Sequence, residues 1–408
     1  MVGAVTSSGP PGAHRTRTRT ALALLAALLL LTTTGWTSIR TPSPTADPLR
    51  AELTAWHLAR TGPRADAPPH RVALFFARLG PHQRARLAAR FPLVVGNLHG
   101  APTALRYRAN RTALTRALQR ERHRAATARL SADGRQETVR RIHRLRALTR
   151  PGRQILAFDP AGAGRVVEVL GDLDRAERVS VVVPGVGTGL LTFERSARRY
   201  SAPLGMARSL FAAQRALRGG GASRLRTAVV AWADYTAPRG VGMDSVTGRL
   251  AAAGARRLAA FAEALPGVSA VALFCHSYGS VVCGVAARSL PSRVTDIAVA
   301  GSPGMRAGHV SELGGRARVW AVRDGSDWIA DVPHLEVGGL GHGADPVAPE
   351  FGARVVSATG ALGHSGYFEP GTETVRNFAA LGVGAYRAVR CVGGDDRCRR
   401  DISGEAVA

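Results

Sequence analysis

The sequence predicts an α/β protein, in which a mostly parallel sheet of about eight strands has helices on both faces and follows a basic helical region. Two observations support this fold class. After residue 150, short apolar runs alternate with Gly-rich turns and helical stretches. The later runs are separated by 17 to 43 residues, which is enough for the crossover helices that parallel strands require.

The N-terminus has the pattern of an export signal. Three arginines and no acid precede an unbroken apolar run from Ala21 to Leu31, as in secretory signals. Extending the run to Ile39 gives about 19 residues, marginally enough to span a bilayer. We therefore expect residues 1–39 to be a signal peptide or signal anchor, and the rest of the chain to be secreted or held in the cytoplasmic membrane by residues 21–39. Residues 40–48 are predicted as a linker, and a buried helix of a cytosolic protein is the alternative for the apolar run.

The chain is basic, with 55 Lys+Arg against 29 Asp+Glu and a net charge of +26, and all 55 cations are arginine. Residues 1–150 hold 26 Arg and 6 acids, whereas residues 151–408 hold 29 Arg and 23 acids. The absence of lysine indicates GC-rich codon usage, and the export signal argues against a nucleic-acid partner. Two interpretations of the basic segment stay open, namely solvated helix faces and contact with an anionic membrane or cell-wall polymer.

Residues 49–150 are predicted to form an Arg-rich helical region. Leu114 and Leu118 are four residues apart, and Val139, Ile142 and Leu145 are three apart, with arginines on the remaining faces. Gly- and Pro-containing breaks divide the region into several helices.

The short apolar runs after residue 150 are predicted as strands of a domain spanning residues 151–388, with a C-terminal tail at 389–408. The first two runs lie close together and are expected to form an antiparallel hairpin at the sheet edge. From Val179 onward the runs are continuously aliphatic, as in strands buried on both faces. The predicted strands are Gln154–Phe158, Arg165–Leu170, Val179–Val183, Thr227–Trp232, Val268–Phe274, Val294–Ala300, Arg318–Val322 and Arg354–Ser357.

Ser277 is the candidate nucleophile. The strand ending at Phe274 is followed by Cys275-His276-Ser277-Tyr278-Gly279-Ser280 and then by a helical segment. A serine among small residues at a sharp strand-to-helix turn is raised from the carboxyl edge of the sheet, and the helix start directs backbone N–H groups at the same place. The alternative is an ordinary turn serine.

A nucleophilic serine needs a base and an orienting acid, which in this architecture follow it in the order Ser, Asp/Glu, His. His364, after the last predicted strand, is the predicted base. Asp327, in the loop after Arg318–Val322, is the predicted acid, and Asp345 is the alternative acid. His276 is expected to pack beside the nucleophile, because the side chain of an adjacent residue points away from it.

The tetrahedral intermediate of acyl transfer requires two N–H donors. The backbone N–H of Tyr278 is predicted as the first. The second is expected from Val186 or Gly187, in the Gly-rich loop after Val179–Val183. Phosphate binding by this loop is the weaker alternative, because no Gly-Lys-Ser/Thr sequence follows it.

The four cysteines fit an exported protein. Cys391 and Cys398 are close enough to form a disulfide loop, whereas Cys275 and Cys283 lie in an apolar stretch and are expected to be reduced. The isolated pair His334 and His342 does not have the spacing of a zinc site. We expect neither a metal nor a cofactor.

Several longer motifs identify a family. They are Gly96-Asn97-Leu98-His99-Gly100-Ala101-Pro102, Arg108-Ala109-Asn110-Arg111, Pro184–Thr188, His276-Ser277-Tyr278-Gly279-Ser280, Gly301-Ser302-Pro303-Gly304, Asp327-Trp328-Ile329, Gly341-His342-Gly343-Ala344-Asp345-Pro346, Phe351-Gly352-Ala353-Arg354 and His364-Ser365-Gly366-Tyr367-Phe368. On these motifs the chain resembles, over most of residues 70–385, a family of uncharacterised α/β-hydrolase domains common in GC-rich bacteria. The resemblance implies the α/β-hydrolase fold, a Ser277/Asp327/His364 triad and a helical region that belongs to the family's architecture. Cys275 departs from the glycine usual at its position.

These features together predict an exported serine hydrolase, esterase- or lipase-like, that cleaves a small-molecule or lipid-like ester through an acyl-enzyme. The segment from Trp232 to Met243 is expected to line the acyl pocket. The alternatives are a cell-envelope acyltransferase that uses the same triad, and a non-catalytic basic binding protein of the envelope.

Overall fold

The computed structural model describes residues 47–217, 225–268 and 270–402, which belong to one compact unit. The predicted signal segment, residues 1–39, and the linker up to residue 46 lie outside the described residues. Within the part of the chain that is described, no helix is long and apolar enough to cross a membrane.

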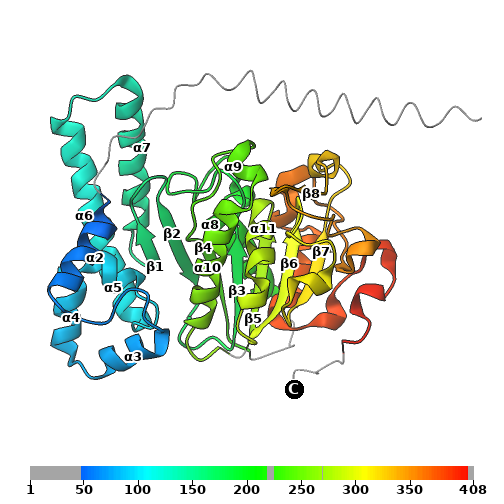
Figure 1. Cartoon of the computed structure of the whole chain (residues 1–408), viewed down its shortest axis with the longest axis horizontal. Helices are drawn as coiled ribbons and strands as arrows, with labels where there is room; N and C mark the ends of the chain where they lie inside the picture. Colours follow the sequence, from blue (N-terminus) through cyan, green and yellow to red (C-terminus); the bar gives the residue numbers. More distant parts are fainter. Residues whose placement is uncertain (1–46, 218–224, 269, 403–408) are drawn as a thin grey trace, which may run out of the picture. The chain divides into compact units, whose positions relative to one another are not determined.

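A single sheet of eight strands forms the centre of the molecule (Figure 1), in the order β1-β2-β4-β3-β5-β6-β7-β10. β1 and β2 form an antiparallel hairpin at one edge, β2 runs antiparallel to β4, and the remaining neighbours are parallel. The strands are β1 (Gln154–Asp159), β2 (Arg165–Leu170), β3 (Arg178–Val183), β4 (Thr227–Ala233), β5 (Ala270–His276), β6 (Val294–Ala300), β7 (Arg318–Val322) and β10 (Arg354–Val355). The predicted fold class and the edge hairpin are confirmed.

Helices cover both faces of the sheet, because alternate residues of the central strands point to opposite sides. Val181 and Leu273 pack in one cluster with α10 (Arg249–Glu263) and α11 (Tyr278–Ala286). Val182 and Phe274 pack in the other with α8 (Pro203–Leu217) and α12 (Glu373–Val383). Both faces are therefore buried, as the continuous aliphatic runs predict.

The N-terminal helices lie beside the hairpin edge of the sheet (Figure 1). Asn97 forms two hydrogen bonds with the backbone of β1, since its Nδ2 donates to the Phe158 carbonyl (2.7 Å) and its Oδ1 accepts from the Phe158 N–H (3.1 Å). Asn110 Nδ2 donates to the Ile155 carbonyl at 3.0 Å. These amides bond to the edge strand in place of a further strand. The helices are α2 (Pro48–Leu58), α3 (Pro69–Ala77), α4 (Pro81–Arg90), α5 (Pro92–Asn97), α6 (Thr103–Thr127) and α7 (Ala132–Leu148).

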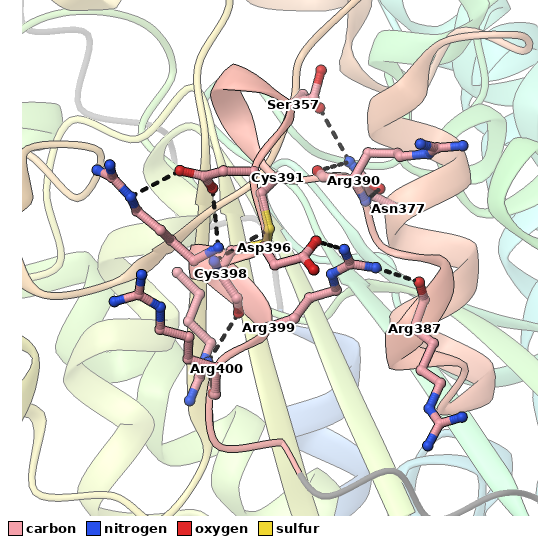
Figure 2. The surroundings of a disulfide bond; sticks show 12 residues. Ser357, Asn377, Arg387, Arg390, Cys391, Asp396, Cys398, Arg399 and Arg400 are labelled. Carbon is pink, nitrogen blue, oxygen red and sulfur yellow. Dashed lines mark hydrogen bonds and ion pairs between the residues drawn. A yellow bond between two sulfur atoms is a disulfide. The ribbon is translucent and has the colours of Figure 1, made fainter.

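A disulfide between Cys391 and Cys398 closes a loop near the other edge of the sheet (Figure 2). The Ser357 N–H donates to the Arg390 carbonyl (2.9 Å), and Asn377 bonds to the backbone of both residues. The C-terminal segment is thus hydrogen-bonded to the chain that directly follows β10, the edge strand of the sheet.

A second disulfide joins Cys275 to Cys283, so the expectation that these cysteines are reduced is wrong. Cys275 lies in the last part of β5 and Cys283 lies in α11. The sharp turn at Ser277 folds α11 back along β5, which brings two fully buried side chains into contact. An apolar setting was a poor guide to redox state, because it did not reveal that the two side chains face each other.

Replacing both Cys391 and Cys398 with serine should destabilise the fold. For a loop of this length the lost restriction of the unfolded chain is about 2–3 kcal/mol, or roughly 2–4 °C in Tm for a chain of this size. Thermal unfolding of the double variant beside the wild-type protein measures this, and an unchanged Tm would show that the loop contributes nothing.

Candidate active site

Ser277 has a left-handed backbone conformation, with φ 55° and ψ −129°, at the junction of β5 and α11. Such a φ is strained for a residue with a side chain and persists only when its surroundings hold it. The Ser277 N–H donates to the Ala300 carbonyl at 2.9 Å. A Cβ added at Gly279 would lie 2.3 Å from the Val183 carbonyl oxygen, so only glycine allows α11 to approach β3 this closely.

The structure brings Ser277, His364 and Asp327 into one chain of hydrogen bonds. His364 Nε2 lies 2.9 Å from Ser277 Oγ, and its Nδ1 lies 2.9 Å and 3.1 Å from the two carboxylate oxygens of Asp327. Asp327 follows β7, and His364 belongs to a 3-10 helix, Gly363–Phe368. Three segments distant in sequence therefore meet at the carboxyl edge of the sheet.

The Asp327 carboxylate is fully buried and held by hydrogen bonds. Burial alone raises the pKa of a carboxyl group, but hydrogen bonds from His364, Tyr367 and the Ile329 N–H outweigh it and lower the pKa of Asp327 below its ordinary value. The group is therefore ionised at neutral pH, as required to orient an imidazole and stabilise its protonated form.

Tyr367 is a site residue that the sequence reasoning did not single out. Its hydroxyl donates to Asp327 Oδ2 and accepts from the Asp324 N–H. Tyr367 follows His364 by three residues on a 3-10 helix, where residues at that spacing share one side. The three-residue spacing of His364 and Tyr367 can be seen in the sequence, but the 3-10 helix that places both on one side cannot.

His276 packs beside the site, as expected. Its Nε2 lies 2.7 Å from the backbone carbonyl oxygen of His364, and the two rings are 4.9 Å apart. Burial, and then the charge of His364, lower the pKa of His276 to about 4. A neutral His276 donates to that carbonyl and helps to fix the loop that carries His364.

Asp345, the alternative acid, is engaged elsewhere. It forms an ion pair with Arg323 and lies 3.8 Å from His334 Nε2. His364 Nδ1 contacts Asp327 instead, so the geometry favours Asp327 as the acid.

The loop after β3 passes directly over Ser277. A Cβ added at Gly185 would lie 2.7 Å from Ser277 Cβ and 3.1 Å from Oγ. The Gly187 N–H already donates to the Pro238 carbonyl at 2.7 Å, which leaves Val186 as the candidate second donor. The Tyr278 N–H is the first amide of α11 and has no carbonyl partner within the helix.

Two of the residues expected to line the acyl pocket support this loop instead. Trp232 is fully buried in the core, and the Tyr235 hydroxyl donates to the Pro184 carbonyl at 2.6 Å. The Trp232 ring stacks on the Tyr235 ring at 5.9 Å, so the pair supports the loop. The exposed part of that segment begins after Tyr235 and includes Val241 and Met243.

Comparison with known proteins places the chain in a family. A model of the alpha/beta hydrolase family matches residues 159–337. An uncharacterized protein of Mycobacterium tuberculosis is 33% identical over 210 residues, covering 48% of this chain and 77% of that protein. The chain belongs to the alpha/beta hydrolase family.

Two further proteins are similar to parts of the chain. A second uncharacterized Mycobacterium tuberculosis protein is 27% identical over 374 residues, covering 77% of this chain and 55% of that protein. Among solved structures, dienelactone hydrolase from Anabaena variabilis is similar with a TM-score of 0.33 and 16% identity, over 56% of this chain and 93% of that chain.

The buried Asp327 carboxylate should make stability depend on pH. Because folding lowers the pKa of Asp327, its stabilising contribution is complete above the unfolded pKa and is lost as pH falls through the folded one. Urea unfolding of wild-type protein and Asp327→Asn should show a free-energy difference that is largest near about pH 7 and shrinks toward about pH 3.

The exposed Glu369→Gln variant is the control and should unfold like the wild-type protein at both pH values. A difference between wild type and Asp327→Asn that does not change with pH would contradict the assigned pKa direction.

Proposed function

We propose that this protein is an exported serine hydrolase that cleaves an ester through an acyl-enzyme, with Ser277 as nucleophile, His364 as base and Asp327 as acid. The observation that carries the proposal is the continuous hydrogen-bond chain from Ser277 Oγ through His364 to the buried Asp327. In this arrangement the base touches the nucleophile and the acid fixes the base, which is what activation of a serine requires.

The proposed reaction has two halves. Ser277 Oγ attacks the ester carbonyl while His364 Nε2 takes its proton, and the resulting oxyanion accepts hydrogen bonds from the N–H groups of Tyr278 and Val186. His364 then gives the proton to the departing alcohol, which leaves an acyl group on Ser277. Water, deprotonated by the same imidazole, releases the acid and restores the serine.

Exposed apolar side chains around the site support an ester with an apolar acyl group. Trp328 is 47% exposed, and its ring lies 4.8 Å from that of His364. The other large exposed apolar residues on the loops at this edge of the sheet are Val241, Met243, Leu335, Val337, Leu340 and Leu362. Thr247 and Leu340 pair through a β-bridge, which joins the loop after β4 to the hairpin of β8 (Glu336–Val337) and β9 (Leu340–Gly341).

Export rests on two independent features. The N-terminal sequence has the charge and apolar pattern of a secretory signal. The two disulfides, Cys275–Cys283 and Cys391–Cys398, are typical of proteins that fold in an oxidising compartment.

A fluorophosphonate probe tests the nucleophile. Wild-type protein should be labelled, Ser277→Ala should not, and His364→Ala should react at least about 1000-fold more slowly because the serine loses its base. Labelling is measured by mass spectrometry of the modified peptide. Ser280→Ala, three residues along the same helix, is the matched control and should be labelled like the wild type. Labelling that persists in Ser277→Ala would end the proposal.

Tyr367→Phe tests whether the Tyr367 hydroxyl positions the Asp327 carboxylate. Loss of a hydrogen bond to a charged group removes about 1.5–3 kcal/mol, so kcat for an apolar p-nitrophenyl ester should fall roughly 10- to 100-fold with KM little changed. The Tyr367 hydroxyl is also one of the groups that lower the pKa of Asp327, so without it Asp327 should become protonated at a higher pH. The acidic limb of the kcat/KM profile is therefore expected at higher pH.

Tyr386→Phe is the matched control, because the Tyr386 hydroxyl also donates to a buried carboxylate, that of Asp296, at 2.8 Å. Asp296 lies near the start of β6, whereas Ser277 contacts Ala300 at the end of that strand. Tyr386→Phe should leave the pH profile unchanged. An identical profile for wild type and Tyr367→Phe would contradict a positioning role for Tyr367.

A further inference from the structure

A pocket of about 600 Å³, separate from the Ser277 site, lies between the N-terminal helices and the sheet. Its lining includes Pro266 and Arg293, which precede β5 and β6, whereas Ser277 follows β5. Since β5 has seven residues, the two sites are about 20 Å apart along the strand direction. In Figure 1, α3 lies at the lower end of the drawing, whereas α9 (Met243–Val246) and β8, near the Ser277 side, lie at the upper end. The pocket is thus distinct from the candidate active site.

Arg106 lines this pocket and is only 4% exposed. Its Nε donates to the Gly96 carbonyl at 3.2 Å, but its Nη2 has no acceptor among the described residues. Within the same part of the chain, Arg106 forms no ion pair. The carboxylate that influences it is Asp234, which is bound by Arg257 through two hydrogen bonds of 2.7 Å. A buried guanidinium without a counter-ion is costly, so this position favours an anion.

The positive charge of Arg106 persists at neutral pH. Burial lowers the pKa of Arg106 only to about 10. Its neighbour His99 is half-buried, and desolvation, followed by the charge of Arg106, lowers the pKa of His99 to about 3. His99 is therefore neutral, and Arg106 carries the charge at this place.

Two helix N-termini add to the positive potential. α6 and α3 begin after Pro102 and Pro68, neither of which supplies a side-chain cap, and neither helix has an acid in its first turn. The N–H groups of Leu105 and Arg106 both donate to the Pro102 carbonyl, which leaves the amides of Thr103 and Ala104 as the outermost donors. Both of these residues line the pocket, so the helix end offers N–H groups and a partial positive charge to an anion.

The motif Gly96–Pro102, which the proposed reaction does not use, builds this pocket. The Gly96 carbonyl accepts from both Arg106 and Asn110, so it fixes the start of α6. Gly100 has φ 91°, and a Cβ there would lie 2.1 Å from the Pro69 carbonyl oxygen. Only glycine lets the first turn of α3 approach so closely.

The other residues that line the pocket are apolar side chains and exposed acids. Leu156, Leu173 and Phe261 are buried apolar residues in the wall. Asp174 and Glu263 also line the pocket, but both are exposed, where solvent screens their charge, whereas Arg106 is not. The volume is within the usual range for a small-molecule site.

We propose that this pocket binds a small organic anion, with a phosphate or carboxylate group at Arg106 and the N-terminus of α6 and an apolar part against Leu156, Leu173 and Phe261. The site is independent of Ser277, so the proposal does not depend on the proposed reaction.

Isothermal titration of the full chain with inorganic phosphate, phenyl phosphate and benzoate, at constant ionic strength set by sodium chloride, tests this site. We expect wild-type protein to bind at least one of the phenyl compounds, and the tighter one identifies the anionic group. Arg106→Met should weaken that binding at least 10-fold. Arg108→Met, an exposed arginine two residues along the same helix, is the matched control and should bind like the wild type.

A second variant keeps the test decisive if Arg106→Met does not fold. Ala104→Asp places a carboxylate in the first turn of α6, so it should raise Tm without added anion and abolish binding of the phenyl compounds. A cooperative thermal unfolding transition, measured by circular dichroism, shows that each variant is folded, whether or not the protein reacts with a fluorophosphonate. Absence of binding of all three anions to wild-type protein, or unchanged binding by both Arg106→Met and Ala104→Asp, would overturn the proposal.

Discussion

The strained turn at Ser277 is the constraint on which the candidate active site depends. A left-handed φ at a serine is held only because the backbones around it cross very closely, and two glycines make this possible. Gly279 brings α11 against β3, and Gly185 brings the following loop against the Ser277 side chain. The Cys275–Cys283 disulfide then ties β5 to α11 on the two sides of the turn. The cysteine at a position where glycine is usual is accommodated because its side chain is bonded into the helix.

Segments outside the sheet contact both of its edge strands, β1 and β10. These contacts prevent a strand of another chain from pairing with the sheet that carries Ser277. On the hairpin side, Asn97 and Asn110 bond to the backbone of β1 from helices. On the other side, the C-terminal segment closed by Cys391 and Cys398 pairs next to β10, with Val356 bridging to Cys391. Unpaired edges invite association with other chains, so both flanking segments protect the same sheet.

The sequence was enough to predict the strands and the meeting of Ser277, Asp327 and His364 at one edge of the sheet. Continuous aliphatic runs mark buried parallel strands, and parallel strands bring their carboxyl ends to one edge. It was not enough where the answer depended on which side chains face each other. Three contacts depend on loop conformation in this way. They are the Cys275–Cys283 disulfide, the hydrogen bond from the Tyr367 hydroxyl to Asp327, and the hydrogen bond from the Gly187 N–H to the Pro238 carbonyl. The unpaired state of Arg106 likewise depends on the position of every carboxylate around it.

The Arg-rich composition of the helical region is partly a consequence of its attachment to the sheet. Arg141 bonds to Glu121 and to the Pro160 carbonyl, and Arg153 reaches Glu168 and Glu194, so these guanidinium groups connect helices and loops to the hairpin. Guanidinium groups suit this role because their planar donors reach a carboxylate and carbonyls together. Arg106 differs from Arg141 and Arg153 in having no acid to bind. The total charge therefore says little about a partner, whereas Arg106, which is buried without a counter-ion among the described residues, marks the place where we propose that an anion binds.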